Sequence, residues 1–238
     1  MPRPSEPAAP SVPPGRSQIP LWITIPFTLY AGVLVPIYWR DYGPANFLWF
    51  CDMGMLMTLA GLWLNSPLLI SIEAIALALP QTVWIVDFVS GGRLIGISHY
   101  MFESGIPLFT RLISTFHIWL PILLVWLIWQ IGYDRRAVWI QSIIAAAVLI
   151  ASYLLSDPRH PPTGYPDVAV NVNRVYGVHT TDVQHWMPPL AFLALHILFW
   201  PLCVYLPTHL IFRKAFREPA HGSDSSPATI APQVVGER

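Results

Sequence analysis

The chain has 238 residues, of which 54% are hydrophobic and only 11% are charged, and its formal net charge is zero. Soluble domains carry roughly 25% charged residues, so this composition indicates a membrane protein. The absence of a basic field excludes nucleic acid as a partner, and two cysteines are too few for a disulfide framework.

The predicted elements begin with residues 1–18, which are rich in proline, serine and alanine and predict a disordered N-terminal tail. Six apolar stretches follow, each long enough to cross a hydrocarbon core that takes roughly 20 helical residues. We therefore predict an all-α, polytopic transmembrane bundle in residues 19–212, and the polar residues 213–238 predict a disordered C-terminal tail. The expected spans lie at about 19–39, 45–64, 67–88, 106–131, 138–155 and 186–207.

Basic residues are shared unequally between the two ends of these spans. The end with both termini carries Arg3, Arg16, Arg135, Arg136, Arg213, Lys214, Arg217 and Arg238. The other end carries Arg40, Arg93, Arg159 and Arg174. Because positive residues are enriched on the cytoplasmic side, we predict a bacterial inner-membrane protein with both termini in the cytoplasm.

Several spans contain ionisable side chains, and burying a charge at such depth costs several kcal/mol. The depth of each residue follows from the helical rise of 1.5 Å per residue. By this measure the residues expected in the outer half of the membrane are Asp52, Asp87, Arg111, His117 and His196. The sequence thus predicts a polar site open to the periplasmic side. Glu73 falls towards the cytoplasmic face, where we expect a structural role.

Some of these residues have a structural interpretation as well. Cys51 begins a stripe of small residues of the kind that lets helices pack closely, which is the alternative to a nucleophilic role. Asp87 and Arg111 lie near an interface, where they could pair with each other or extend into water. Asp52 and His117 are the hardest of the set to explain as packing residues.

A long polar loop, residues 156–185, carries further candidates. Asparagine amides and an arginine fork hold phosphates or carboxylates, which makes Asn171, Asn173 and Arg174 candidate substrate-binding residues. The alternative is an ordered turn whose asparagines cap backbone groups. Metal-capable side chains occur in residues 179–185, but no metalloenzyme motif matches them. We predict neither a metal site nor a cofactor.

Four short segments carry a family resemblance: Phe50-Cys51-Asp52, Ser114-Thr115-Phe116-His117, Asn171–Gly177 and Trp186-Met187-Pro188-Pro189. They resemble segments of the YwaF-type integral membrane proteins of bacteria, which are multi-span proteins of similar size. Eukaryotic relatives of that wider group are thought to transfer acyl chains between phospholipids. The resemblance implies that Cys51 is the acyl acceptor and His117 its base. The chain departs from the family pattern at Trp49, where a histidine is common.

Three functions remain open at this point. In the first, a lipid-acting enzyme, the thiolate of Cys51 attacks an ester and His117 takes its proton. In the second, a carrier or channel, Asp52 and His117 bind or relay a cation or proton together with Asp87. The third is a non-catalytic scaffold whose buried polar groups fix helix packing.

We expect catalytic roles for Cys51, Asp52 and His117. Substrate-binding roles are expected for Asp87, Arg111, Asn171, Asn173, Arg174 and His196. In the enzyme hypothesis an aspartate orients the imidazole and Arg111 holds a lipid phosphate. Membrane lipids are the expected partners, and the sequence indicates no particular protein partner.

Overall fold

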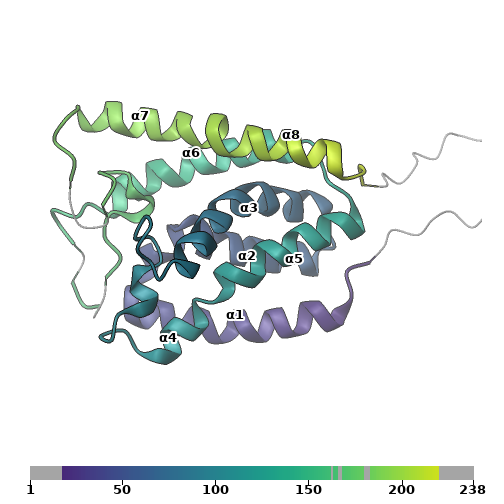
Figure 1. Cartoon of the computed structure of the whole chain (residues 1–238), viewed down its shortest axis with the longest axis horizontal. Helices are drawn as coiled ribbons and strands as arrows, with labels where there is room; N and C mark the ends of the chain where they lie inside the picture. The colour runs from purple at the N-terminus through teal and green to yellow at the C-terminus, as the bar shows by residue number, and fades with distance from the viewer. Residues whose placement is uncertain (1–17, 162, 166–167, 180–182, 220–238) are drawn as a thin grey trace, which may run out of the picture.

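The computed structural model describes residues 18–161, 163–165, 168–179 and 183–219, and every regular element in these ranges is helical (Figure 1). The predicted all-α fold is confirmed. The predicted tails at 1–17 and from 220 onward lie outside the described residues. The elements are α1 (Leu21–Tyr42), η1 (Pro44–Leu48), α2 (Phe50–Trp63), α3 (Pro67–Val89), η2 (His99–Phe102), α4 (Leu108–Ile113), α5 (Phe116–Ile131), α6 (Ala137–Leu155), η3 (Val172–Arg174), α7 (Pro189–Phe199), η4 (Trp200–Tyr205) and α8 (Leu206–Ala215).

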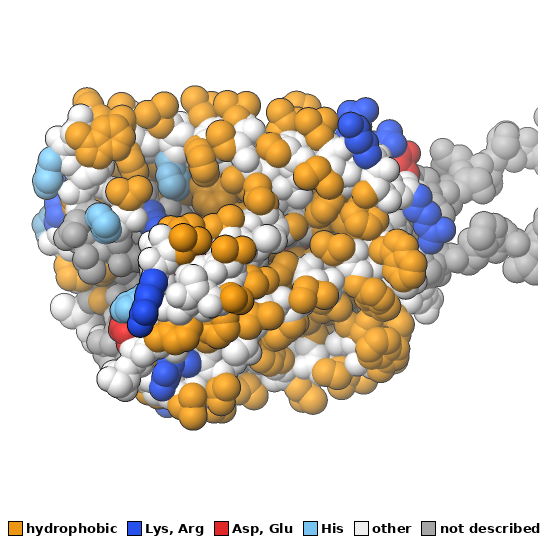
Figure 2. Space-filling view, viewed as in Figure 1, with side chains coloured by type: hydrophobic (Ala, Val, Ile, Leu, Met, Phe, Trp, Pro, Cys, Tyr) orange, Lys and Arg blue, Asp and Glu red, His pale blue; other side chains and the backbone are white. Residues whose placement is uncertain are grey.

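Five helical segments of the described chain are long and apolar enough to cross a membrane: α1, α3, α4 with α5, α6, and α7 through α8. Exposed leucine, isoleucine, valine and tryptophan side chains are distributed along these segments. The space-filling view shows an apolar surface along the molecule, with the charged side chains mainly towards its two ends (Figure 2). This distribution is the one that a hydrocarbon core requires.

Helix α3 forms the centre of the bundle. Every residue from 70 to 77 is buried, which leaves no solvent- or lipid-facing stripe in that part of the helix. A helix that is apolar on all sides belongs in an interior, and α3 packs against α2, α5 and α6. The helix begins with Pro67 at its first position, and the Ser66 hydroxyl accepts a hydrogen bond from the Leu69 amide at 3.3 Å.

The second predicted span, 45–64, differs from the structure. It is divided at Trp49 into the 3-10 helix η1 and the helix α2. Helix α2 has 14 residues, about 21 Å at 1.5 Å per residue, and a hydrocarbon core is about 30 Å thick. It is therefore too short to cross alone. Close packing on α3 holds it, because a Cβ added at Gly54 would lie 2.5 Å from Oε2 of Glu73.

The fourth predicted span, 106–131, is broken between α4 and α5. At the break, the hydroxyls of Ser114 and Thr115 donate to the carbonyls of Thr110 and Leu112 at 3.0 and 2.6 Å. Hydroxyls that bond to nearby backbone carbonyls compete with the regular helix ladder. The hydropathy pattern is continuous across this point, which is why it predicted one helix.

The last span begins and ends later than its predicted bounds, since the α7–η4–α8 segment runs from Pro189 to Ala215. The first residues of the predicted C-terminal tail are thus helical. Element η4 is a π-helical turn that contains Pro201. Proline removes a backbone donor and clashes with the preceding turn, so a locally wider turn is a common response.

The two ends of the bundle differ in content. Both ends of the described chain lie at one end, which we call the termini end (Figure 1). There the Ile19 amide donates to Oδ1 of Asn65 at 2.6 Å, and Arg135 pairs with Glu218 at 2.7 Å. The opposite end, the loop end, holds the connections 43–49 and 90–107 and the described parts of 156–188. The buried polar groups of interest gather near the loop end.

Candidate functional site

Asp52 lies in the first turn of α2 and is 3% exposed. Its Oδ2 accepts a hydrogen bond from Nδ2 of Asn46 at 2.9 Å. Its Oδ1 is buried and has no hydrogen-bond partner within the described residues. A buried carboxylate oxygen without a donor costs free energy, so its presence in a folded protein needs an explanation.

Aromatic hydroxyls and a thiol surround this carboxylate. Tyr38 donates to Oγ of Ser114 at 2.7 Å, and the Tyr100 hydroxyl lies near the same serine. Both phenols lie within electrostatic range of Cys51 and Asp52. We call this group, Asn46, Cys51, Asp52, Tyr38, Tyr100 and Ser114, the Asp52 centre. Its members come from α1, η1, α2, η2 and the α4–α5 junction.

His117 lies beside the Asp52 centre, at the start of α5. Its Nδ1 donates to the Ser114 carbonyl at 2.8 Å, and its ring stacks on Trp84 with centroids 4.7 Å apart. Across the described chain, no hydrogen bond joins His117 to Cys51. The histidine therefore contacts the centre through the backbone of Ser114, and its predicted role as the base of Cys51 stays a prediction.

Asp87 organises the connection that follows α3. Its carboxylate is fully buried and accepts from the amides of Ile95, Gly96 and Ser98 at 2.7, 3.1 and 2.8 Å, and from the Ser98 hydroxyl at 2.6 Å. In the part of the chain that the structure describes, it makes no ion pair with Arg111. The loop that follows α3 therefore donates all four of these hydrogen bonds to the Asp87 carboxylate.

Arg111 lies on α4 and is half-buried. Its Nη1 donates to the Met101 carbonyl at 3.3 Å, whereas its Nε is buried without a partner among the described residues. Glu73 lies apart from the Asp52 centre, buried against Gly54 and near Tyr205. Neither residue contacts Cys51 through a hydrogen bond in the described ranges.

Asn171 is a turn-forming residue of the long loop. Its Nδ2 donates to the carbonyls of Gly177 and His179 at 3.2 and 2.5 Å, and its Oδ1 accepts from the Tyr176 amide at 2.8 Å. Its backbone φ is 47°, in the left-handed region where asparagine is tolerated. The capping alternative considered for this residue matches these contacts.

Asn173 connects the loop to α2. Its Oδ1 accepts from the Phe50 amide at 3.2 Å, and its Nδ2 donates to the Leu48 carbonyl at 2.7 Å and to Oγ of Ser152 at 3.0 Å. The side chain therefore supplies an acceptor to the first, otherwise unpaired, amide of α2. Its amide, like that of Asn171, is used within the protein.

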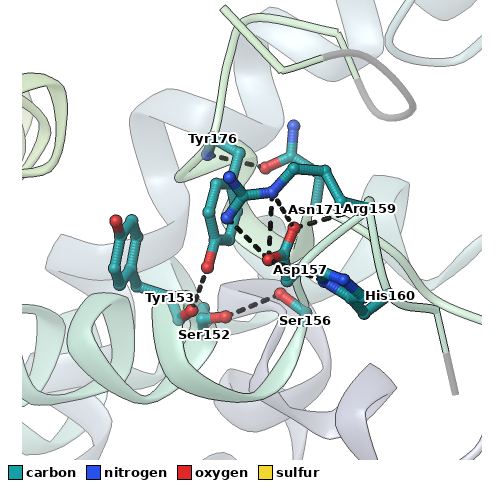
Figure 3. A network of polar contacts seen from close by, with 8 residues as sticks. All are labelled: Ser152, Tyr153, Ser156, Asp157, Arg159, His160, Asn171 and Tyr176. Atoms are coloured by element: carbon teal, nitrogen blue, oxygen red, sulfur yellow. Dashed lines mark hydrogen bonds and ion pairs between the residues drawn. The ribbon is translucent and has the colours of Figure 1, made fainter. Parts of the chain in front are cut away.

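The same loop contains a polar network that the sequence did not single out (Figure 3). Nη2 and Nε of Arg159 donate to Asp157 at 2.7 and 2.8 Å, and the guanidinium lies 5.5 Å from the centroid of the Tyr176 ring. The Tyr176 hydroxyl donates to the Tyr153 carbonyl, and the two rings stack with centroids 4.6 Å apart. The guanidinium of Arg159 holds the pKa of Asp157 below its usual range.

The loop and the last span meet at His196. The imidazole contacts the backbone of Asn173 and lies near the guanidinium of Arg174, although the two segments are far apart in the sequence. Arg174 is half-buried, and burial lowers the pKa of its guanidinium. Trp200, one turn beyond His196, packs on Phe50 with ring centroids 4.8 Å apart. The predicted substrate-binding residues Arg174 and His196 are thus brought together.

The fold and these polar groups define a class: a multi-pass helical membrane protein with polar side chains buried inside its bundle. No protein-family model, curated protein or solved structure matches the chain significantly. The function of this particular membrane protein is therefore inferred from the residues of the Asp52 centre and the loop above it.

Proposed function

We propose that this membrane protein is a lipid-acting enzyme that uses Cys51 to carry an acyl group between lipids. The observation that supports the proposal is the position of the thiol within the Asp52 centre, in electrostatic range of a buried carboxylate whose Oδ1 has no hydrogen-bond partner among the described residues. A nucleophile with a neighbouring proton acceptor is the minimum that covalent acyl transfer requires.

In the proposed reaction, the Cys51 sulfur attacks the ester carbonyl carbon while its proton passes to Oδ1 of Asp52. The ester C–O bond breaks, the departing lipid alkoxide takes that proton, and a thioester remains on Cys51. The hydroxyl of a second lipid then attacks the thioester, and its proton returns to the sulfur. Tyr38 and Tyr100 lie beside Cys51 and Asp52, and either phenol would have to turn away from Ser114 to donate to the developing negative charge.

The proposal also places the protein in a membrane with a defined orientation. The loop end faces the periplasm and both termini face the cytoplasm of a bacterial inner membrane, in accord with the excess of basic residues at the termini end. Membrane lipids are the substrates. The resemblance of the Cys51 and Asn171–Gly177 segments to YwaF-type proteins supports the same assignment.

The test is the intact mass of the full chain purified in mild detergent, with and without hydroxylamine. We expect an adduct of one acyl chain that hydroxylamine removes and that Cys51→Ala abolishes. Cys203→Ala is the matched control, because Cys203 is exposed on the last span and its adduct state should not affect Cys51. Loss of the adduct in Cys203→Ala alone would indicate surface acylation and contradict the proposal.

The unpartnered Oδ1 of Asp52 also favours a second candidate, the binding of a proton or small cation. A carboxylate buried in a membrane protein without a cationic partner either carries a proton or holds a cation. In this candidate, an unacylated wild-type protein in liposomes shows a proton or cation flux that Asp52→Asn abolishes and Cys51→Ala leaves unchanged. The two variants therefore separate the candidates.

A further inference from the structure

Two buried nitrogen atoms on the last span have no hydrogen-bond partner in the described residues: Nε2 of His196 and Nε1 of Trp200. The residues are four apart, so they share one face of the helix, and their ring centroids are 6.1 Å apart. Buried polar atoms in native proteins are nearly always satisfied, and an orphan calls for a ligand or an ordered water.

Arg174 provides a third donor group at the same place. Its guanidinium makes no hydrogen bond or ion pair within the described residues, and it lies near His196. Asp157, the acidic residue of this loop that the structure describes, is already bound by Arg159. Arg174 adopts a positive φ of 59°, next to Asn173, whose side-chain hydrogen bonds to Leu48 and Ser152 fix this part of the loop.

The three side chains have the chemistry of an anion site. Guanidinium and indole groups only donate hydrogen bonds, and imidazole donates from both nitrogens when protonated, the form that a bound anion stabilises. An arginine fork matches the oxygens of a phosphate. We propose that Arg174, His196 and Trp200 form a binding site for a phosphate group.

The surroundings of the site make a lipid a natural source of that phosphate. The last span exposes large apolar side chains next to it, among them Leu195, Leu198 and Leu202. Trp200 begins a π-helical turn, a feature that is frequent at functional sites. The space-filling view shows a hollow in this face of the molecule, near the loop end, with a histidine side chain at its edge (Figure 2).

This site is separate from the Asp52 centre and does not depend on acyl transfer. Phe50 packs on Trp200, whereas Cys51 and Asp52, the next residues of α2, lie near Tyr38 and Tyr100. The start of α2 therefore stands between the two groups.

Native mass spectrometry of the full chain in detergent tests the proposal with three probes: phosphatidylglycerol, diacylglycerol with the same acyl chains, and inorganic phosphate. We expect the phospholipid to bind at least tenfold more tightly than the diacylglycerol. Arg174→Gln and Trp200→Phe should each weaken that binding roughly tenfold, since each removes a donor to a charged oxygen. Trp200→Phe keeps the packing on Phe50, so it remains informative if Arg174→Gln folds poorly.

Arg93→Gln and Trp139→Phe are matched controls, because both residues are exposed, and they should bind as the wild type does. Cys51→Ala should bind normally too, which separates this site from the proposed reaction. Binding of inorganic phosphate that the same two variants weaken would support the site with free phosphate as its ligand. Equal binding of phospholipid and diacylglycerol without phosphate binding, or wild-type binding by both site variants, would overturn it.

Discussion

Asn173 accepts a hydrogen bond from the backbone amide of Phe50, which lies 3.2 Å away and 123 residues earlier in the chain. The same side chain donates to the Leu48 carbonyl, so one amide group holds both sides of the junction between η1 and α2. Asp52 follows in the first turn of α2, and Arg174 follows Asn173 in the loop. One clamp therefore positions both proposed sites.

Replacing Asn173 tests this clamp. Asn173→Ala leaves a buried carbonyl and a helix-start amide without their partner, which typically costs about 1–3 kcal/mol for each buried group left unsatisfied. We expect a clearly lower unfolding temperature in detergent and faster proteolysis in the 156–185 loop. His179→Ala, at an exposed position of the same loop, should leave both unchanged. An Asn173→Ala protein as stable as the wild type would show that the clamp contributes little.

A methyl group added at Gly54 should force the buried side chains of Glu73 and Leu77 to move at the contact between α2 and α3. A Cβ there would lie 2.5 Å from Oε2 of Glu73 and 2.8 Å from Cδ1 of Leu77. We expect Gly54→Ala to destabilise the protein by about 1–3 kcal/mol, as overpacking does. Gly32→Ala is the control, because no atom outside its own helix lies within 4 Å. It should be neutral or stabilising by up to about 1 kcal/mol. Similar unfolding curves for the two variants would contradict the packing argument.

The ion pair between Asp157 and Arg159 should make the stability of the folded protein depend on pH. The carboxylate of Asp157 has its pKa lowered by Arg159 in the folded protein, so its stabilising effect is present above the unfolded pKa of about 3.9. The effect is lost as the pH falls through the folded pKa. For a pair this exposed we expect less than about 1 kcal/mol. The difference in unfolding temperature between wild type and Asp157→Asn should be constant from pH 7 to 5 and shrink below about pH 4.

Arg159→Gln provides the control for that titration. In the Arg159→Gln background, Asp157→Asn should change the unfolding temperature less than it does in the wild type, because the guanidinium is gone and only His160 and the backbone amide of residue 159 still contact the carboxylate. A difference that is as large at pH 3 as at pH 7 would mean that Asp157 acts through its shape and not its charge.

Hydropathy located the five segments of the described chain that are long enough to cross a membrane, because long apolar runs have few alternatives there. It also predicted a sixth span at 45–64, where α2 has only 14 residues. It did not predict the breaks at Trp49 and Ser114. These depend on hydroxyl and amide groups that bond to the backbone only once distant segments are in place. For the same reason, the sequence alone does not indicate that Tyr38 and Trp200 lie among the buried polar groups. An aromatic residue in a membrane span is ordinarily assigned a packing role, and only its neighbours in the structure indicate another one.

The sequence named residues of the candidate site but not the groups that each of them contacts. Asp52 is buried with one oxygen that has no hydrogen-bond partner in the described part of the chain, and Arg174 of the loop lies near His196 of the last span. Asp87 bonds its own loop, and His117 bonds the Ser114 carbonyl. Which helices are neighbours decides these outcomes, and one sequence carries little information about helix neighbours.

Asp87 and Asp52 should respond oppositely to the same substitution. Asp87→Asn replaces a carboxylate that accepts four hydrogen bonds with a group that carries two donors. Hydrogen bonds to charged groups contribute about 1.5–3 kcal/mol each, so we expect a strong loss of stability and proteolysis within 90–98. A stable Asp87→Asn protein that lost lipid turnover would instead support the substrate-binding role predicted from the sequence.

Asp52→Asn should leave the fold intact and remove the function. Asp52 makes one hydrogen bond through Oδ2, and its buried Oδ1 has no partner in the described chain. Removing a buried charge without a cationic partner is neutral or stabilising, whereas the proposed reaction needs that oxygen as its proton acceptor. We expect an unfolding temperature equal to or above that of the wild type together with loss of the hydroxylamine-sensitive adduct. A less stable variant that still forms the adduct would mean that Asp52 serves the fold, and that Cys51 loses its proton to another group. A gain in stability together with a loss of function is common when a functional carboxylate is replaced, because active sites are rarely the most stable arrangement of their residues.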